Sequence, residues 1–379
     1  MTQASQKAKI AVFYPAFLGG GAEAVGLWIL EALKQNYDLT LFTTSGVDFN
    51  HLNALYGTNL SADLVNVQSL FPTSARPIIN ALIANCYQVR MVLFHLLIRY
   101  LKSNKDDYHL LISAYNAVDF GKKGLQYIHW IKVLEAHPIY NRISNFSRDH
   151  ACTNLSITNS HAVSNLAKKE YGFDASVVYP PVVIDSLDLP WHAKENAFIC
   201  SGRLTKAKEP HRVISILKRV REQGFDIKLY LTGGGGGAYP WRYTSFIKKL
   251  VKENSSWITL YEDLKYEDYV KVVSKCKYGI HFKTEPFGIS IAEMVRSGAI
   301  PFVKSKGGQV EIVGEHNQAL FFDSENEAVE KIIRVLNNPD QQEKLLDGLA
   351  QQKHLFSTQR FITEMNQVVE GYFASSGRV

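Results

Sequence analysis

The chain has 379 residues, of which 46% are hydrophobic; this is enough for two globular domains with separate cores and excludes a disordered chain. Its formal net charge of +6 favours anionic partners, but lysine and arginine alternate with acidic residues instead of forming basic arms. We therefore expect no nucleic-acid partner.

The first strand is predicted at residues 9–14, KIAVFY, and it leads into the stretch LGGGAEAVG and a helix over residues 22–35. Gly19, Gly21 and Ala24 fit the G-x-G-x-x-A spacing of dinucleotide-binding loops, in which the backbone approaches a pyrophosphate. This spacing alone is weak evidence for a cofactor.

The second predicted strand, residues 39–46, argues against a nicotinamide or flavin cofactor. A dinucleotide-binding unit carries an acidic residue at the end of this strand, where it binds a ribose hydroxyl. Here LTLFTTSG ends in threonines, and Asp48 follows only after the turn. We expect no cofactor, and an NAD-dependent oxidoreductase is kept as an alternative.

Residues 78–102, IINALIANCYQVRMVLFHLLIRYLK, are expected to form a core helix of the first domain, because Asn85, Gln88 and Arg90 interrupt the apolar face. The alternative is an interfacial helix that contacts a membrane surface, as its length and basic flanks allow. No segment reaches the ~18 apolar residues of a membrane span, and the N-terminus lacks a signal peptide. The expected location is the cytoplasm, with peripheral attachment at the inner membrane face as the alternative.

The cysteines are far apart in the sequence and show neither a C-x-x-C pair nor a histidine at zinc-ligand spacing: Cys86, Cys152, Cys200 and Cys276. We expect reduced, buried thiols in a cytosolic protein and no bound metal.

Short apolar runs alternate with helical patterns along both halves of the chain, which predicts βαβ units around parallel sheets. In one unit Ser160 is placed to cap a helix that ends at Gly172. The proline-containing stretch at residues 180–196 is typical of a linker. The predicted fold is α/β, with two Rossmann-like doubly wound domains facing across a cleft. The expected boundaries are an N-terminal domain at 1–180, a linker at 181–195, a C-terminal domain at 196–355 and a final helix at 356–379 that returns to the first domain.

The segment HFKTEPFGISIAEM, residues 281–294, contains two glutamates, Glu285 and Glu293, separated by seven residues. Glu285 lies before a predicted turn, where it can accept hydrogen bonds from hydroxyl groups. Glu293 lies on an otherwise apolar helix, so its carboxylate needs a partner if it is buried. Two glutamates at this spacing are also common on helix surfaces.

A helix is expected to start directly after the turn, at the backbone N–H groups of Phe287, Gly288 and Ile289. Unpaired N–H groups at a helix start form an anion site. The pattern therefore indicates a phosphate-binding position beside Glu285.

The stretch EPFGISIAE resembles the E-x7-E signature of the retaining family 4 glycosyltransferases, which have the GT-B fold and use nucleotide sugars. Other segments are similar to motifs of that family and follow in the same order: TNSHAVSNLAKKEYG to VVYPPV at 158–182, SGRLTKAKEP at 201–210 and KGGQVEIVG at 306–314. The resemblance thus extends over most of the chain.

The resemblance implies roles for four charged residues of the second domain. Arg203 and Lys208 match the pair that grips the donor diphosphate. Glu285 matches the residue that binds donor-sugar hydroxyls, and Glu293 matches the residue that holds the ribose hydroxyls.

For the glycine-rich stretch near the N-terminus, the resemblance implies a loop whose backbone, at Gly19, Gly20 and Gly21, lies against the donor diphosphate and the acceptor. His129 matches a histidine near the transferred sugar, although Trp130 and the residues after it depart from the family pattern. Without the resemblance, His129 is more typical of a packed core residue.

Four further donor-binding positions are implied with less specific signals. Gly233, the first of five glycines, matches the end of the second strand of the domain, and Tyr261 and Glu262 are candidates for the nucleobase pocket by position only. His281 stands between a strand and Glu285, where a packing role is the alternative.

The implied reaction moves a hexose, glucose by family frequency, from a nucleoside diphosphate to a hydroxyl of a glycan or lipid-linked acceptor, with retention and without a metal. Uridine diphosphate is the expected carrier and guanosine diphosphate the second choice, in surface polysaccharide or glycolipid synthesis. The alternatives are a nucleotide-sugar-binding protein without transferase activity and an epimerase or phosphorylase of the same architecture.

Overall fold

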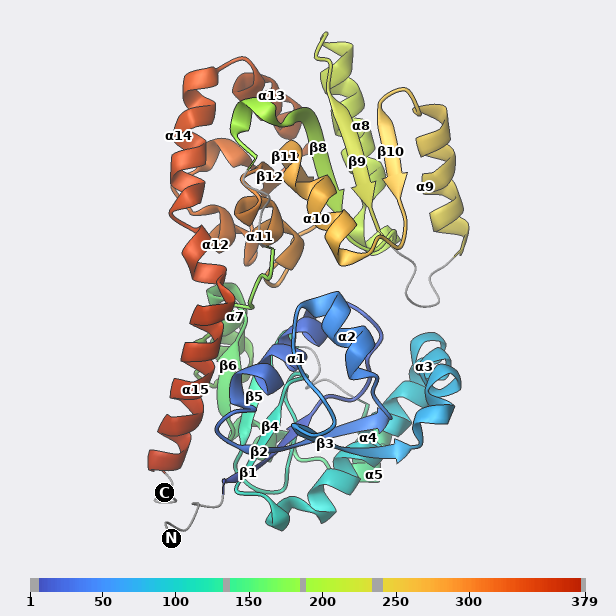
Figure 1. Ribbon diagram of the computed structural model, residues 1–379, viewed down its shortest axis with the longest axis vertical. Helices are drawn as coiled ribbons and strands as arrows, with labels where there is room; N and C mark the ends of the chain where they lie inside the picture. The colour runs from blue at the N-terminus through green and yellow to red at the C-terminus, as the bar shows by residue number, and fades with distance from the viewer. Residues whose placement is uncertain (1–6, 132–136, 185–188, 234–240, 376–379) are drawn as a thin grey trace. The chain divides into compact units, whose positions relative to one another are not determined.

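The computed structural model describes residues 7–131, 137–184, 189–233 and 241–375, with the exception of the Trp241 side chain. The chain divides into two compact units, which are described separately (Figure 1). The N-terminal unit combines Met1–Pro181 with Thr358–Val379, and the C-terminal unit is Val182–Ser357.

The N-terminal unit contains a parallel sheet in the order β3-β2-β1-β4-β5-β6-β7. Its strands are β1 Lys9–Phe13, β2 Asp38–Ser45, β3 Val65–Phe71, β4 Leu110–Ser113, β5 Leu125–Ile128, β6 Leu155–Thr158 and β7 Ser176–Val177. Its helices are α1 Gly21–Leu33, α2 Phe49–Tyr56, α3 Arg76–Asn85, α4 Tyr87–Ser103, α5 Pro138–Ser144, α6 Arg148–Cys152, α7 His161–Tyr171 and α15 Thr358–Ser375.

The C-terminal unit contains a second parallel sheet in the order β10-β9-β8-β11-β12-β13. Its strands are β8 Glu195–Ser201, β9 Lys228–Thr232, β10 Ile258–Tyr261, β11 Cys276–His281, β12 Ile300–Lys304 and β13 Phe321–Phe322. Its helices are α8 Pro210–Glu222, α9 Trp241–Glu253, α10 Tyr266–Ser274, α11 Ile289–Arg296, α12 Gln309–Val313, α13 Glu325–Leu336 and α14 Pro339–Ala350. Both sheets are therefore of the doubly wound α/β type that the alternating pattern predicts.

The sequence predicts the ends of helix α7 correctly, because capping residues mark both of them. The Ser160 side chain accepts a hydrogen bond from the Val163 N–H at the start of α7, and Gly172 ends the helix with a φ of 73°. Of the linker stretch, residues 185–188 lie outside the described residues, and β8 already begins at Glu195.

Helix α15 packs against α1 within the N-terminal unit. The Asn366 side chain donates to the Ala32 carbonyl at 2.9 Å, and the Tyr37 and Phe373 rings stack with centroids 5.8 Å apart. The last helix thus completes the unit that the first helix begins (Figure 1).

The expectation of one helix over residues 78–102 is wrong. The backbone is extended at Cys86, and the Asn85 side chain bonds to the Ala81 carbonyl, so α3 ends there and α4 starts anew. Among the described residues no single helix is long and apolar enough to span a membrane. The segments Thr73–Asn85 and Tyr87–Ser103 reach that length and hydropathy only when they are counted together, and they are bent by 119°.

The cysteines are free thiols, as expected, but two of them are not buried. Cys200 and Cys276 are buried, and burial raises the pKa of each thiol to about 12. Cys86 and Cys152 are only half-buried.

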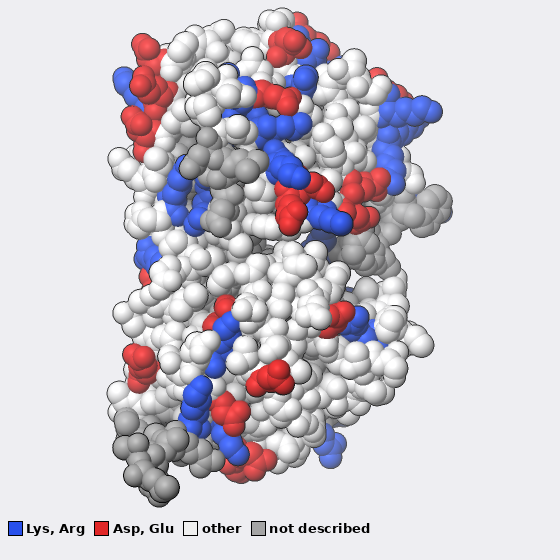
Figure 2. All heavy atoms as spheres, in the orientation of Figure 1, with Lys and Arg blue, Asp and Glu red and all other residues white. Residues whose placement is uncertain are grey.

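Acidic and basic side chains alternate over the face shown in Figure 2, without an extended area of one sign. This distribution agrees with the interspersed charges of the sequence.

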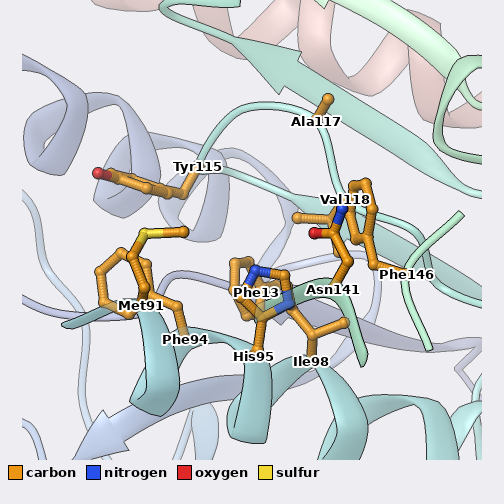
Figure 3. A pocket seen from close by; sticks show the side chains of 10 residues that line it. All are labelled: Phe13, Met91, Phe94, His95, Ile98, Tyr115, Ala117, Val118, Asn141 and Phe146. Atoms are coloured by element: carbon orange, nitrogen blue, oxygen red, sulfur yellow. The ribbon is translucent and has the colours of Figure 1, made fainter. Parts of the chain in front are cut away.

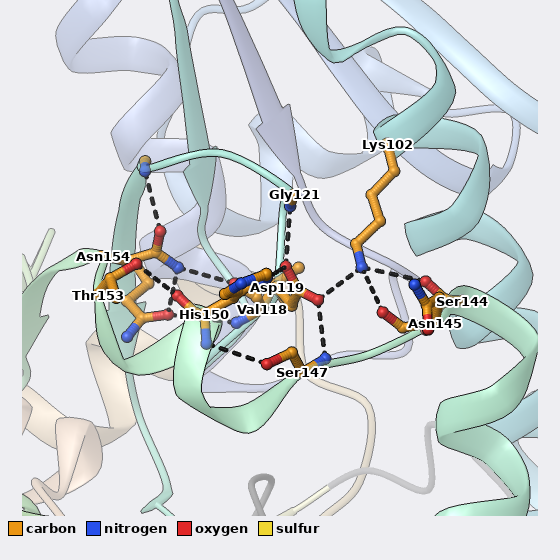
Figure 4. A network of polar contacts seen from close by, with 12 residues as sticks. Lys102, Val118, Asp119, Gly121, Ser144, Asn145, Ser147, His150, Thr153 and Asn154 are labelled. Carbon is orange, nitrogen blue, oxygen red and sulfur yellow. Dashed lines mark hydrogen bonds and ion pairs between the residues drawn. The ribbon is translucent and has the colours of Figure 1, made fainter.

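A buried polar network ties α4 to the loop after β4 and to the end of α5 (Figure 4). The Asp119 carboxylate, 1% exposed, accepts from the Lys102 ammonium at 2.6 Å and from the N–H groups of Gly121 and Ser147 at 2.8 Å each. Lys102 also donates to the Ser144 carbonyl at 3.0 Å. One carboxylate therefore fixes three segments of the N-terminal unit.

Candidate active site

Glu285 lies in the turn between β11 and α11, at the carboxyl edge of the C-terminal sheet. Its backbone N–H donates to the Gln309 side chain at 2.8 Å, and its carbonyl accepts from the Gly308 N–H at 3.0 Å. The residue is only 9% exposed. The turn that carries Glu285 is therefore held by the segment between β12 and α12.

The carboxylate of Glu285 contacts two nitrogen groups. The Lys208 ammonium is 2.6 Å and the His281 Nε2 is 3.0 Å from the same oxygen, Oε1. Burial alone would raise the pKa of Glu285, but the hydrogen bond from His281 and the charge of Lys208 outweigh it and lower the pKa to about 2. Glu285 is thus ionised at neutral pH.

Two strand ends bring this cluster together. Lys208 ends a short 3₁₀ helix, Lys206–Lys208, in the loop after β8, and His281 is the last residue of β11, which pairs with β8. Ligands of doubly wound sheets bind at the carboxyl ends of the strands. The structure therefore brings together three predicted site residues from two motifs.

The glycine pair Gly307 and Gly308 packs against the turn of Glu285. A Cβ atom on Gly307 would lie 2.4 Å from the Glu285 carbonyl oxygen, and one on Gly308 would lie 2.3 Å from the Pro286 carbonyl oxygen. Both approaches are too close for any side chain. The G-G of the KGGQVEIVG segment is therefore needed to support the turn.

At the start of α11, a buried phenylalanine is followed by a glycine at the N-cap position. Phe287 is buried and its ring meets that of Phe356 with centroids 5.6 Å apart. Gly288 has a φ of 114° and no side chain caps the helix, whose first residue is Ile289. The helix N-terminus therefore carries the positive end of the helix dipole, and the first turn of α11 holds no acidic residue.

Glu293 lies on the face of α11 that meets α10. The Tyr269 hydroxyl donates to Glu293 Oε2 at 2.6 Å, which is the partner that a buried carboxylate requires. Burial raises the pKa of Glu293 to about 7, although the bond from Tyr269 opposes this rise. Sequence reasoning missed Tyr269, because one tyrosine on an amphipathic helix carries no recognisable signal.

Arg203 and Gly233 lie in the loops that follow β8 and β9. Arg203 is exposed. The Gly233 N–H donates to the Tyr261 carbonyl at 3.0 Å, and a Cβ on Gly233 would lie 2.5 Å from the Gly202 carbonyl oxygen. Gly233 therefore allows two strand ends to approach closely, and residues 234–237 of the glycine run lie outside the described residues.

The candidates for the nucleobase pocket lie at the end of the edge strand β10, where Tyr261 is the last residue and Glu262 follows it. Glu262 forms an exposed ion pair with Lys248 at 2.9 Å, and the Tyr261 ring packs against that of Tyr230 with centroids 5.9 Å apart. Both residues have partners in the C-terminal unit, and their role in base binding stays a prediction.

In the N-terminal unit, side chains already bind the N–H groups of the glycine-rich stretch. The Gly19 N–H donates to Glu23 at 2.8 Å and the Gly20 N–H to the Tyr56 hydroxyl at 3.2 Å, while Gly21 begins α1. Burial raises the pKa of Glu23 to about 7. A diphosphate that binds these two N–H groups must first displace the bonds to Glu23 and Tyr56.

His129 follows β5 and is fixed by the loop after β4. Its Nε2 lies 3.0 Å from the Ala114 carbonyl, and its N–H donates to the Asn116 side chain at 2.8 Å. Burial lowers the pKa of His129 to about 4, so the ring is neutral at pH 7. The contact with a carbonyl assigns the proton to Nε2 and leaves Nδ1 as a hydrogen-bond acceptor.

Among the described residues no group of three or more histidine, cysteine, aspartate or glutamate side chains is placed to hold a metal ion. The Lys208 ammonium, 2.6 Å from Glu285, places a positive charge at this edge of the sheet.

Residues 186–350 match the family model of glycosyl transferases group 1. This match covers most of the C-terminal unit, including Lys208, Glu285 and Glu293. It supports a glycosyltransferase and favours this class over the oxidoreductase alternative.

A curated relative supports the same class. The chain is 26% identical over 201 residues to the GDP-Man:Man(3)GlcNAc(2)-PP-Dol alpha-1,2-mannosyltransferase of Dictyostelium discoideum. The match covers 49% of this chain and 39% of that protein, so the chain spans about two fifths of the relative's length.

Solved structures show the fold. Anabaena HepE, crystallised with UDP and glucose, has a TM-score of 0.67 and 17% identity over 97% of this chain and 100% of its own. The sucrose-phosphate synthase of Thermosynechococcus elongatus has a TM-score of 0.68 and 15% identity over 97% and 100% of the two chains. The fold is GT-B.

Proposed function

We propose that the protein is a retaining glycosyltransferase of the family 4 type that transfers a hexose from a nucleoside diphosphate to a hydroxyl of a glycan or glycolipid without a metal. The observation that carries this proposal is the ionised Glu285 between Lys208 and His281, with Glu293 on the helix that follows. All the charged positions of the family motifs are filled, which disfavours a binding protein without activity.

In the proposed reaction, the bond between the sugar and the diphosphate breaks while the acceptor hydroxyl attacks from the same face. Arg203, Lys208 and the start of α11 stabilise the charge that develops on the leaving diphosphate. For this, Lys208 exchanges part of its contact with Glu285 for a phosphate oxygen. Glu285 then accepts hydrogen bonds from hydroxyls of the donor sugar.

UDP is the proposed carrier and glucose the proposed sugar, and HepE, which shares the fold, was crystallised with both. GDP-mannose is the second candidate, because the Dictyostelium relative is named as a GDP-mannose enzyme. The two donors differ in base and sugar, so one binding screen separates them.

The test is a thermal-shift screen against UDP, GDP, ADP, their sugars and NAD, with and without EDTA. A ligand at 100 times its dissociation constant stabilises the folded state by ~2.7 kcal/mol, which is a measurable shift. A selective shift with one nucleoside diphosphate that survives EDTA supports the proposal and names the carrier. A shift with NAD alone overturns it.

Glu293→Gln is expected to weaken nucleotide-sugar binding by about 10- to 150-fold at pH 8, because a hydrogen bond to a charged group contributes ~1.5–3 kcal/mol. In the unaltered protein, affinity is expected to rise from pH 6 to pH 8. The carboxylate, whose pKa is about 7, ionises in this range and becomes the better acceptor for ribose hydroxyls. Titration calorimetry with a nucleotide sugar checks both effects.

The matched variant is Tyr269→Phe, which keeps Glu293 and removes only its hydrogen-bond donor. Because that bond lowers the pKa of Glu293, the rise in affinity should move to higher pH in Tyr269→Phe and disappear in Glu293→Gln. Equal pH profiles in all three proteins would remove Glu293 from the ribose site.

We also propose that the protein acts in the cytoplasm and contacts the inner membrane face through α3 and α4. These helices expose apolar side chains, with Ile78 67% and Leu82 43% exposed, and they also carry basic residues such as Arg76 and Arg99. Apolar side chains next to basic ones favour an anionic membrane surface.

The double variant Ile78→Ser and Leu82→Ser is expected to reduce sedimentation with anionic phospholipid vesicles by about 10-fold or more, since each buried apolar side chain contributes ~1.5–3 kcal/mol. The control is Phe246→Ser, which removes an apolar side chain that is 45% exposed in the C-terminal unit. Equal sedimentation of the double variant and the control would contradict membrane contact through these helices.

A further inference from the structure

The N-terminal unit contains a partly open pocket between α4 and the loop after β4 (Figure 3). Phe13, Met91, Phe94 and Val118 are among the side chains that form its mostly apolar wall. Among the described residues no acidic, lysine or arginine side chain lines it. The pocket therefore suits an uncharged, apolar group.

The pocket lies where the order of the sheet reverses. Strands β2 and β3 extend from β1 to one side, and β4 to β7 extend to the other. Phe13 is the last residue of β1, and Tyr115 follows β4 by two residues. This point, beyond the carboxyl ends of the strands, is where doubly wound sheets bind their ligands.

Two polar groups face this apolar pocket. Asn141 of α5 lines it, and the Oδ1 atom of Asn141 is buried without a hydrogen-bond partner. His95 bonds through Nδ1 to the Ser144 hydroxyl at 2.9 Å, and burial lowers the pKa of His95 to about 4, so the ring is neutral. Buried acceptors are normally paired, so the free oxygen of Asn141 indicates a ligand that donates a hydrogen bond.

The loop at residues 114–118 belongs both to this pocket and to the setting of His129. Its side chains Tyr115, Ala117 and Val118 line the pocket. Two other residues of the loop hold His129, Ala114 through its carbonyl and Asn116 through its side chain. The same loop therefore contacts a ligand in the pocket and holds the histidine that the proposed function places near the transferred sugar.

We propose that this pocket binds the hydrocarbon chain of an amphiphilic acceptor, with a hydroxyl or amide of the adjoining polar head bonded to Asn141. The inference rests on the proposed function and extends it by naming the acceptor class. A purely polar glycan can donate a hydrogen bond to Asn141 but leaves the apolar wall without a partner. A chain joined to a sugar satisfies both and extends its head group towards His129.

The experiment measures binding of methyl, hexyl, octyl and decyl β-glucopyranosides below their micelle concentrations by titration calorimetry. Each methylene that enters the pocket should tighten binding by about fourfold, until the pocket is full. No dependence of the dissociation constant on chain length would overturn the proposal.

Two variants on neighbouring positions of α4 localise the effect. Met91 lines the pocket, whereas Val92 is 36% exposed and does not line it. Met91→Trp should weaken octyl glucoside binding at least 10-fold, while Val92→Trp should leave it within about twofold. If Met91→Trp fails to fold, Met91→Lys, which puts a charge at the mouth, takes its place. Equal effects of the two positions would overturn the site.

A hydrocarbon chain could also belong to a bound membrane lipid. In the presence of the nucleotide sugar selected by the thermal-shift screen, octyl glucoside should stimulate release of the nucleoside diphosphate more than methyl glucoside does. Binding without such stimulation would overturn the acceptor assignment. Because the glycosides bind without donor, a failed donor screen together with a clear chain-length series would reject the proposed function but not the pocket.

Discussion

Replacing Glu285 by glutamine is expected to reduce sugar transfer by about 100- to 1000-fold while nucleoside diphosphate binding is retained or becomes tighter. The carboxylate shares one oxygen with Lys208 and His281, at 2.6 and 3.0 Å. Glutamine keeps the shape but removes the negative charge. Lys208 then has no competing anion and is available to the diphosphate, whereas the acceptor for the donor-sugar hydroxyls is lost.

The two halves of this prediction need separate measurements. Transfer is followed as release of the nucleoside diphosphate, and binding is measured by calorimetry with the nucleoside diphosphate alone. Glu253→Gln, which removes an exposed glutamate paired with Lys249, is the control and should leave both values unchanged. A variant of Glu285 that loses binding and turnover in parallel would make the residue a part of the diphosphate site instead.

Replacing Asp119 by alanine is expected to lower the free energy of unfolding of the N-terminal unit by about 3–5 kcal/mol, because removal of one partner leaves a buried charge uncompensated. Asp119 is 1% exposed and accepts the Lys102 ammonium and two backbone N–H groups (Figure 4). Its loss leaves Lys102 without its carboxylate beside the end of α5. We expect the loop at 114–118 and the pocket to loosen as well.

Urea titration followed by circular dichroism gives the change in stability, and binding of a nucleoside diphosphate reports whether the C-terminal unit stays folded. Asp174→Ala is the matched control, because Asp174 is 86% exposed in its ion pair with Lys168. We expect little change in the control. Equal unfolding curves for the two variants would mean that the Asp119 network does not hold the unit together.

Much of the fold follows from local patterns. The alternation of apolar runs with helices predicts two parallel sheets, and Ser160 and Gly172 mark the ends of α7 correctly, because caps are short-range features. The break between α3 and α4 could not be predicted in the same way. It comes from the extended backbone of Cys86, where neither glycine nor proline signals the end of a helix.

The candidate site likewise contains features that local sequence predicts and features that depend on contacts between distant residues. The positions of Glu285 and Glu293 follow from one segment and its resemblance to a family motif. The contact between Lys208 and Glu285 joins residues 77 positions apart, and the bond from Tyr269 to Glu293 joins two helices. The first pair depends on how strands β8 and β11 lie side by side and the second on how α10 packs against α11, which composition and spacing do not specify.

The position of α15 has a consequence for how the protein is made. The C-terminal unit is one continuous segment, whereas the N-terminal unit needs α15, which follows that segment in the chain. During synthesis the strands β1 to β7 emerge first. The contacts of α15, from Asn366 to Ala32 of α1 and from Phe373 to Tyr37, form only after the whole of the other unit has been translated. The unit whose strands are synthesised first is therefore the unit that finishes folding last.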